Sequence, residues 1–355
     1  MHGDRAVTLK IGCETCPRVG PVPEGIHRPY WSVMIPAYNP SSLLEKALQS
    51  VLDQDPGPEE MQIAVVDDHS PSGEAERIVN RVAPGRVEFH RQPANVGLAG
   101  NWNGSIERAR GRWVHLLHQD DHVLPGFYER LKQAGYGGSK AGAAFCRHYM
   151  SDAEGNWEHL SNLEQPDPGV LDGWLGRISR MQLIQCASIV VRREVYELVG
   201  GYRADLSLAL DWEMWVRIAT CFPVWYEPEI LARWLVHRGN ESSRLEEAGD
   251  DIPDVFRAIE VIEGHLPAEL KASAGDLLLK SYRDREIVAT YRLFNEGNYR
   301  SGMVRFGMAC RCDPTLKFSP INFRFRKWAA KLWLKSLFTG TKSGSLTDAI
   351  NRIDS

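Results

Sequence analysis

The sequence has no long hydrophobic run. Residues 1–16, MHGDRAVTLKIGCETC, lack the apolar core of a secretory signal, and no uninterrupted apolar segment approaches the roughly 20 residues that a membrane-spanning helix needs. We therefore expect a cytoplasmic protein that does not cross a membrane.

Cysteine is scarce and occurs in an odd number, with 7 residues in a chain of 355. This number argues against a disulfide framework and for reduced thiols. Cys13 and Cys16 form a C-x-x-C pair, but the other close pair, Cys310 and Cys312, is spaced more tightly than usual zinc ligands. We therefore favour a loose N-terminal extension over a zinc site, and the role of Cys13 and Cys16 stays open.

Neither sign of charge dominates. The 42 Lys and Arg residues nearly balance the 46 Asp and Glu residues, which gives a formal net charge of -4 at pH 7 and no reason to expect a nucleic-acid partner. With 43% hydrophobic and 25% charged residues, the composition is that of a globular protein. The length allows one large domain with an elaborate C-terminal part, or two domains.

Strand-like and helix-like segments alternate through the first half of the chain. Residues 31–37 are a short apolar run, and residues 41–52 have apolar positions at helical spacing, with Ser42 and Glu45 as a capping box. Further strands are expected at 61–66, 87–90 and 113–117, and further helices at 74–82 and 101–109. This order predicts an α/β fold in which helices cover both faces of a mostly parallel sheet, a layout of nucleotide-binding type.

The second half of the chain is less regular. We expect strands at 143–150 and 186–192, a helix at 211–219, extended pieces at 224–226 and 231–237, and long helices through 252–310. The predicted organisation is an N-terminal extension (1–29), a main α/β domain (30–245), a helical C-terminal region (246–312) and a basic amphipathic tail (313–355).

Polar residues directly follow three of the expected strands. These segments are Pro36-Ala37-Tyr38-Asn39, Asp67-Asp68-His69-Ser70 and Gln119-Asp120-Asp121-His122. Ligands of open parallel sheets bind at the carboxyl ends of the strands. Two acidic pairs at one edge repel each other unless a cation lies between them, and Mg²⁺ or Mn²⁺ suits carboxylates that share the ion with a substrate phosphate. Taken alone, Asp120 and Asp121 fit turn or helix-capping roles equally well.

Three ordered segments resemble glycosyltransferase family 2, the nucleotide-sugar glycosyltransferases with the GT-A fold. They are VMIPAYNPSSLLEKALQSVLDQ (33–54), AVVDDHSPSG (64–73) and PANVGLAGNWNGSIERARGRWVHLLHQDDHVLPG (93–126). The resemblance spans about residues 31–243, so it identifies 30–245 as a GT-A catalytic domain. It implies a GT-A type nucleotide-binding sheet flanked by helices, with a helical C-terminal extension.

The resemblance implies a donor-nucleotide site and a metal site at the strand ends. Asp68 is similar to the Asp that reads the nucleotide base, commonly uracil. The other residues implied in nucleotide binding are Pro36, Tyr38, Asn39, Asn95, Gly97, Asn101 and Asp120. Asp120 and Asp121 match the family's DXD acids, with Asp121 as a ligand of Mn²⁺ or Mg²⁺ and Asp120 toward the ribose and the metal. Many members have an acidic residue two places before Asp120, where this chain has His118.

A later segment, LDWEMW (210–215), resembles part of the family's acceptor site. Asp211 is the expected general base, which takes a proton from the acceptor hydroxyl, and Trp212 and Glu213 are expected on the acceptor side. The alternatives are that Asp211 caps its helix, that Trp212 belongs to the core and that Glu213 is a surface acid.

The segment WLVHRGNESS (234–243) resembles the part of the family that closes over the diphosphate. His237 is a candidate metal ligand, and Arg238 is a candidate contact to phosphate charge. A structural His at the end of a strand fits this sequence at least as well.

These features predict metal-dependent, inverting transfer of a sugar. By the resemblance, the donor is a nucleoside-diphosphate sugar, commonly UDP-linked, and the acceptor is a saccharide or lipid-linked saccharide in glycan or polysaccharide biosynthesis. One alternative is a nucleotidyltransferase, which would need a Gly-rich, basic loop where this chain has Ala37-Tyr38-Asn39-Pro40. The other is a non-catalytic nucleotide- or carbohydrate-binding protein of the same fold. The donor sugar, the linkage and the oligomeric state stay open.

The basic tail allows two interpretations. From Lys317 to Lys342 the chain has basic and aromatic residues but no acidic ones. On a helical wheel, one side is apolar and consists of Phe325, Trp328, Ala329, Leu332 and Trp333. The other side is basic and consists of Lys327, Lys331 and Lys335. Such a helix suits a membrane interface, which would place the protein peripherally on the cytoplasmic face of the membrane through 317–342. It equally suits a helix docked on the catalytic domain with a solvated basic face.

Overall fold

The computed structural model divides the chain into two compact units, Met1–Ala272 and Ser273–Ser355. It describes residues 16–136, 140–237, 245, 251–320, 323, 325 and 327. The division falls inside the predicted helical region 246–312, so that region is not one unit. Its first helix packs on the α/β unit, whereas its last helices have a core of their own.

One mixed sheet forms the centre of the first unit. Its strands are β1 (Trp31–Ala37), β2 (Met61–Asp67), β3 (Glu88–Arg91), β4 (Trp113–Leu116), β5 (His122–Val123), β6 (Ala143–Ser151), β7 (Trp157–Leu160), β8 (Gly169–Val170), β9 (Ile189–Arg192) and β10 (Val224–Leu235). Their order is β3-β2-β1-β4-β9-β6-β10-β5, with β7 beside β6 and β8 beside β10. The first four strands run parallel, but β9 is antiparallel to both β4 and β6. The prediction of a mostly parallel sheet is therefore correct for the first half only.

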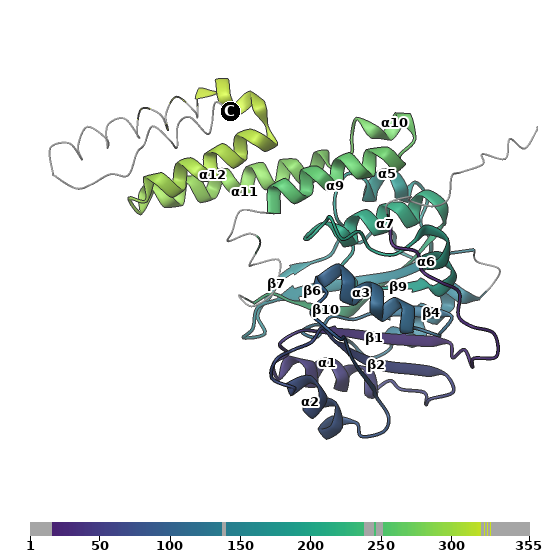
Figure 1. Cartoon of the computed structure of the whole chain (residues 1–355). Coiled ribbons are helices and arrows are strands. Elements are labelled where there is room, and N and C mark those ends of the chain that lie inside the picture. The colour runs from purple at the N-terminus through teal and green to yellow at the C-terminus, as the bar shows by residue number, and fades with distance from the viewer. Residues whose placement is uncertain are drawn as a thin grey trace, which may run out of the picture. The chain divides into compact units, whose positions relative to one another are not determined.

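Helices cover both faces of this sheet, which confirms the predicted α/β class. They are α1 (Leu43–Leu52), α2 (Glu74–Val82), α3 (Gly97–Arg108), α4 (Phe127–Leu131), α5 (Trp174–Ile178), α6 (Arg193–Val199), α7 (Leu210–Cys221), α9 (Asp251–His265) and α10 (Ala268–Lys271). Figure 1 shows α1 and α2 on one face and α3, α6 and α7 on the other. Alternate residues of a strand point to one face, so Val33, Ile35 and Val65 join Leu44 and Leu48 of α1 in the main core.

Helix α3 begins at Gly97 rather than at the predicted Asn101. The carboxylate of Asp68 accepts hydrogen bonds from the backbone N–H groups of Val96 and Gly97, at 2.8 and 3.0 Å. These N–H groups belong to the first turn and have no partner within the helix, so a cap supplied from the end of β2 extends the helix toward its N-terminus. This cap comes from a distant part of the sequence, so the local pattern could not show it.

The predicted capping box of α1 is wrong. Ser42 adopts helical dihedral angles, and its side chain makes no capping hydrogen bond. Instead, Ser41 Oγ accepts a hydrogen bond from Leu43 N at 3.3 Å. The cap therefore lies one residue earlier than the S-x-x-E spacing indicates.

Two strands of the second half also differ from the prediction. β9 begins only at Ile189, because Cys186–Ser188 forms a 3-10 turn in which Ser188 N and Ser188 Oγ both donate to Gln185 O, at 2.9 and 2.8 Å. β10 is continuous over 224–235 instead of two extended pieces. It keeps its pairing with β6 through register shifts between residues 227 and 232.

The described part of the N-terminal extension packs on the first unit. Cys16 and Val19 are buried. Pro17 O accepts a hydrogen bond from Gly201 N at 2.7 Å, and Gly20 O accepts one from Arg193 Nη2 at 2.9 Å. Residues 16–20 are thus held by the unit, and Cys13 lies outside the described residues.

The second unit is a helical hairpin. Helices α11 (Asp276–Asn295) and α12 (Tyr299–Cys312) are followed by a 3-10 turn, Pro314–Phe318. Their apolar core consists of Phe294, Met303, Phe306, Ala309, Cys310, Leu316 and Phe325. Gly302 must lack a side chain, because the ring of Phe294 occupies the space that a Cβ atom would need. Within the described residues, no helix is both long and apolar enough to cross a membrane.

Candidate active site

A cavity of about 380 Å³ opens at the carboxyl ends of β1, β2 and β4. Parallel strands that end at one edge bring the residues after them together, as the sequence predicted. The predicted site residues that line the cavity are Pro36, Tyr38, Asp68, Asn95, Gly97, Asn101, Asp120, Asp121, Asp211 and His237. Arg238 lies outside the described residues.

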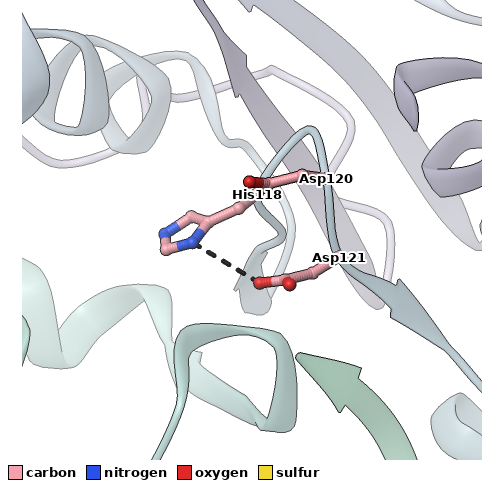
Figure 2. Close-up of side chains that lie close together, drawn as sticks. All are labelled: His118, Asp120 and Asp121. Atoms are coloured by element: carbon pink, nitrogen blue, oxygen red, sulfur yellow. Dashed lines mark ion pairs between the residues drawn. The ribbon is translucent and has the colours of Figure 1, made fainter. Parts of the chain in front are cut away.

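The acids Asp120 and Asp121 each face a histidine. Figure 2 shows them with His118 on the loop between β4 and β5. Asp121 Oδ2 lies 3.5 Å from His118 Nδ1, and Asp120 Oδ2 lies 3.0 Å from His237 Nε2, just after β10. The other oxygen of Asp121 accepts a hydrogen bond from Leu235 N at 2.9 Å. One potential ligand atom from each of His118, Asp120 and Asp121 lies within 4.8 Å of the others.

This group of side chains fits a divalent cation. Burial, together with the nearby charge of Asp120, raises the pKa of the Asp121 carboxyl group. The described lining of the cavity contains four Asp and two His but neither Lys nor Arg, so a diphosphate would add negative charge to negative charge. Carboxylate oxygens and imidazole nitrogens are ordinary ligands of Mn²⁺ and related ions, and such an ion would offset both charges.

His118 is a site residue whose surroundings the sequence did not reveal. Its place two residues before Asp120 was visible as a departure from the family pattern. In the structure its ring packs on Trp102, with 4.8 Å between the ring centroids. Burial disfavours the protonated form of His118, but the adjacent Cys186 and Asp121 outweigh burial and raise its pKa. A protonated His118 would balance the charge of Asp121.

Asp68 lies after β2 with its carboxylate toward the start of α3. Both oxygens accept backbone hydrogen bonds from that helix, and Asn95 Nδ2 donates to the backbone oxygen of Asp68 at 3.3 Å. Asp68 is 3% exposed, and burial raises the pKa of its carboxyl group. Each carboxylate oxygen has a further lone pair, so Asp68 can still accept a hydrogen bond from a ring N–H in the cavity.

Two predicted nucleotide-site residues also support the backbone. Asn101 lines the cavity, and its Nδ2 donates to Val66 O in β2 at 2.9 Å. Asn39 is not among the described residues that line the cavity. Its backbone has a positive φ of 46°, and Asn39 N donates to Ser70 Oγ at 2.9 Å. That hydrogen bond joins the loops that follow β1 and β2.

Gln119 connects the end of β1 to the acidic pair. Its Oε1 accepts a hydrogen bond from Tyr38 N at 3.1 Å, and its Nε2 donates to Tyr38 O at 3.0 Å. This paired contact fixes the loop that carries Tyr38, which is 47% exposed at the cavity. The sequence does not reveal this role, because the two residues are 81 positions apart and no local pattern links them.

Asp211 lines another part of the same cavity and is held by neutral groups. Gln182 Nε2 donates to its Oδ2 and Trp212 N donates to its Oδ1, both at 2.7 Å. Cys186 Sγ lies 3.8 Å from Oδ2. Burial raises the pKa of Asp211 to about 6. A carboxyl group that exchanges its proton near neutral pH is suited to general base catalysis.

The structure does not bring Trp212 and Glu213 into the cavity lining. Trp212 is fully buried, and its Nε1 donates to Ile178 O at 2.6 Å. Glu213 is also fully buried, where Arg217 Nε and Nη2 donate to its carboxylate at 2.9 and 2.8 Å. His265 Nε2 of α9 lies 3.3 Å from Glu213 Oε1. In this structure both side chains fix α7, the helix that carries Asp211.

Helix α9 shapes the wall of the cavity as well. The carboxylate of Asp254 accepts hydrogen bonds from the backbone N–H groups of Ser207, Leu208 and Ala209, at 2.9, 2.8 and 2.9 Å. Ser207 and Leu208 line the cavity, and Asp211 follows directly on α7. A helix predicted to lie outside the catalytic domain therefore positions the loop that leads to Asp211.

Comparison with known proteins agrees with this fold. Residues 32–200 match the model of glycosyl transferase family 2. GalNAc(5)-diNAcBac-PP-undecaprenol beta-1,3-glucosyltransferase of Campylobacter jejuni is 34% identical over 108 residues, which cover 30% of this chain and 34% of that protein. The chain also spans less than two thirds of the length of two further curated relatives.

Two solved glycosyltransferase structures share the fold. Mannosyltransferase PcManGT from Pyrobaculum calidifontis, in complex with GDP-Man and Mn²⁺, has a TM-score of 0.54 at 18% identity over 91% of this chain and 84% of its own. S. aureus TarS 1-349 in complex with UDP-GlcNAc has a TM-score of 0.58 at 13% identity over 88% of this chain and 93% of its own. Residues 32–200 thus match the model of glycosyl transferase family 2, and the chain shares the GT-A fold of these two structures, as the sequence motifs predicted.

Proposed function

We propose that the chain is a metal-dependent, inverting glycosyltransferase. The observation that carries the proposal is that one cavity holds two kinds of carboxylate. Asp120 and Asp121 stand among histidines in a group that fits a cation, whereas Asp211 is held by neutral donors. A single displacement at the anomeric carbon of a sugar needs a base on one side and a stabilised leaving group on the other.

The proposed donor is a UDP-linked sugar. Asp68 supports this choice because its remaining lone pairs can accept the ring N–H of uracil, and the exposed ring of Tyr38 can contact the face of a base. The fold relatives hold UDP-GlcNAc in one case and GDP-Man in the other. Guanine also offers a ring N–H, so GDP-linked sugars are the competitors to test.

Asp121, Asp120 and His237 are the proposed ligands of Mn²⁺ or Mg²⁺, and Arg238 is the proposed diphosphate contact. Such an ion supplies positive charge to the diphosphate as the bond to the sugar breaks. The hydrogen bond to Asp120 raises the pKa of His237, so a proton competes with the metal for this imidazole. Metal affinity should therefore increase with pH.

Asp211 is the proposed general base. It accepts the proton of an acceptor hydroxyl group while that oxygen bonds to the anomeric carbon and the bond from that carbon to the diphosphate oxygen breaks. One displacement inverts the anomeric centre, and no sugar becomes attached to the protein. Gln182 holds the Asp211 carboxylate, while Trp212 and Glu213 support the acceptor side indirectly by fixing α7.

The proposed acceptor is a saccharide or a lipid-linked saccharide, in glycan or polysaccharide biosynthesis. The name of the C. jejuni relative contains an undecaprenol-linked saccharide, although the match covers only 30% of this chain. Among the residues that line the cavity, Ser207 offers a hydroxyl group, and Leu208, Leu210 and Trp234 offer apolar surface. Such a mixture suits a sugar ring, which has apolar faces and polar edges.

The test measures nucleotide release and product stereochemistry. The full chain should release UDP from one or more UDP-sugars in the presence of Mn²⁺ and a saccharide acceptor, and NMR of the product should show the opposite anomeric configuration. Thermal stabilisation by UDP-sugars without any release would instead indicate a non-catalytic binding protein. Pyrophosphate release from a nucleoside triphosphate and a sugar phosphate would indicate a nucleotidyltransferase, and retained configuration would overturn the inverting mechanism.

A further inference from the structure

The second unit presents two phenylalanine side chains to solvent. Phe318 is 93% exposed and Phe323 is 70% exposed, and these are the highest values among the large hydrophobic residues that the structure describes. Apolar rings exposed to water are unfavourable, and Phe318 and Phe323 lie close together in the chain, so we consider them as residues that contact a partner.

A buried neighbour fixes the direction of the Phe323 ring. Phe325 is 1% exposed, and its ring lies 4.9 to 5.0 Å from the rings of Tyr291, Phe294 and Phe306 in the core of the hairpin. Residues two positions apart in a helix point about 200° apart. Burial of Phe325 therefore turns both Phe323 and Lys327 outward, and both are exposed.

The exposed rings lie in the part of the chain that is basic throughout. No Asp or Glu occurs between positions 317 and 342, and the basic residues there are Lys317, Arg324, Arg326, Lys327, Lys331, Lys335 and Lys342. The chain as a whole has a net charge of -4, so this positive charge is a local feature. The positive charge of this segment favours an anionic partner. The exposed rings favour a partner that has an apolar region next to its anionic groups. An anionic lipid bilayer offers both.

We propose that Lys317, Phe318, Phe323 and Lys327, named here the Phe/Lys surface, bind the head-group region of an anionic lipid bilayer. The two rings enter the interface and the two lysines remain at the level of the lipid phosphates. The proposal goes beyond the proposed function, because none of these residues lines the cavity and none takes part in transfer. The lipid-binding proposal also does not depend on the proposed glycosyltransferase activity, since an inactive protein can bind a lipid surface.

The test is sedimentation of the full chain with vesicles. The chain should bind vesicles of phosphatidylcholine that contain about 30% phosphatidylglycerol, and binding should weaken at least about tenfold when NaCl is raised from about 0.05 to about 0.5 M. The double variant Phe318→Ser/Phe323→Ser should bind roughly tenfold more weakly, because the apolar contact is lost. Lys317→Glu/Lys327→Glu should lose roughly tenfold or more, because the charge is reversed.

The control variant removes an exposed aromatic ring from the first unit. Trp157 is 63% exposed, and Trp157→Ser should leave vesicle binding unchanged. All variants should keep the thermal unfolding temperature of the parent and its rate of UDP release, which separates this proposal from the catalytic one.

Three results would overturn the proposal. The first is equal binding to vesicles of pure phosphatidylcholine, which would show that charge plays no part. The second is wild-type affinity in both double variants, or an equal loss in Trp157→Ser. The third is binding of a single-stranded oligonucleotide or a soluble acidic polysaccharide without binding of anionic vesicles, which would assign the surface to a soluble polyanion.

Discussion

Two parts of one cavity use the same side chain in different surroundings. On the side of the strand ends, Asp120 and Asp121 face His237 and His118 at 3.0 and 3.5 Å. On the other side, Asp211 is held by an amide, a backbone N–H group and a thiol. A histidine that loses its proton can bind a cation, so the charge of Asp120 and Asp121 can be balanced by a metal ion. The hydrogen-bond donors around Asp211 are neutral and cannot balance its negative charge.

The surroundings of these carboxylates, and not their residue type, therefore suit them to different roles. A carboxylate pair with imidazoles beside it can hold a divalent ion against a diphosphate. A single buried carboxylate with neutral partners keeps a pKa of about 6 and can take up and release a proton. The first predictions below change one side at a time, so that loss of proton transfer and loss of metal binding can be measured separately.

The largest effect is expected on the side of Asp211. Asp211→Asn keeps the shape of the side chain but removes its ability to accept a proton, so kcat should fall by about 100 to 10,000-fold. Donor affinity, measured by calorimetry with a UDP-sugar and Mn²⁺, should stay within about threefold, a range of less than 1 kcal/mol. The control is Asp167→Asn, which changes an exposed acid that does not line the cavity. A near-normal rate in Asp211→Asn would reduce Asp211 to a structural role.

The next effect is expected on the side of the acidic pair. Asp121→Ala should lower kcat/KM by roughly 100 to 1,000-fold, the usual loss when one electrostatic stabiliser of the leaving group is removed. Mn²⁺ binding, measured by electron paramagnetic resonance without donor, should weaken in Asp121→Ala and remain in Asp211→Asn. Excess EDTA should stop turnover of the parent, and full activity in EDTA would exclude a metal role for the pair.

The third effect is a shift along the pH axis. Asp211 acts as a base only when ionised, and its pKa of about 6 lies above the ordinary value. The rate should therefore be highest above pH 6 and should fall about tenfold for each pH unit below it. The measurement is kcat/KM against pH with a soluble acceptor at saturating Mn²⁺.

A substitution of Gln182 gives a second test of this pH dependence, because the hydrogen bond from Gln182 favours the ionised form of Asp211. In Gln182→Ala the pKa should rise, and the acidic limb should move to higher pH by about one unit. At high pH the rate should change little, so a loss that is equal at every pH would mean a purely structural role. Gln165→Ala, which alters a contact to Asp167 outside the cavity, is the control.

The sequence predicted the elements and the acids of the site, but not the contacts that hold them. β1 begins and ends where its apolar run does, because a strand buried on both faces leaves a continuous pattern. Asp68, Asp120 and Asp121 were found because they follow strands directly. Gln119, Gln182 and Asp254 were missed, because each binds a residue far away in the sequence and no periodicity records such a hydrogen bond.

The predicted boundary at 245 does not coincide with the division between the two compact units, for the same physical reason. Amphipathic spacing predicts that a helix exists but not what its apolar face covers. α9 follows the predicted boundary at 245 and yet packs on α7, with Asp254 bound to the loop before Asp211 and His265 beside Glu213. α11 and α12 have the same helical character and form a separate core.

The smallest effect on activity, and the largest on stability, is expected at Glu213. Burial alone would raise the pKa of Glu213, but the guanidinium group of Arg217 and the imidazole of His265 together outweigh burial and keep this pKa lower than usual. Glu213→Gln removes one charge of a fully buried pair and leaves that of Arg217 uncompensated, which costs about 3 kcal/mol and should lower the unfolding temperature by about 5–10 °C. The control variant Glu45→Gln breaks an exposed ion pair with Arg81 and should change the unfolding temperature by less than about 2 °C.

Activity is the second measurement on Glu213→Gln. At temperatures well below the unfolding of the parent and of the variant, Glu213→Gln should keep kcat and the acceptor KM within about threefold, since the side chain of Glu213 does not line the cavity. An increase in the acceptor KM without loss of stability would instead place Glu213 in direct contact with the acceptor.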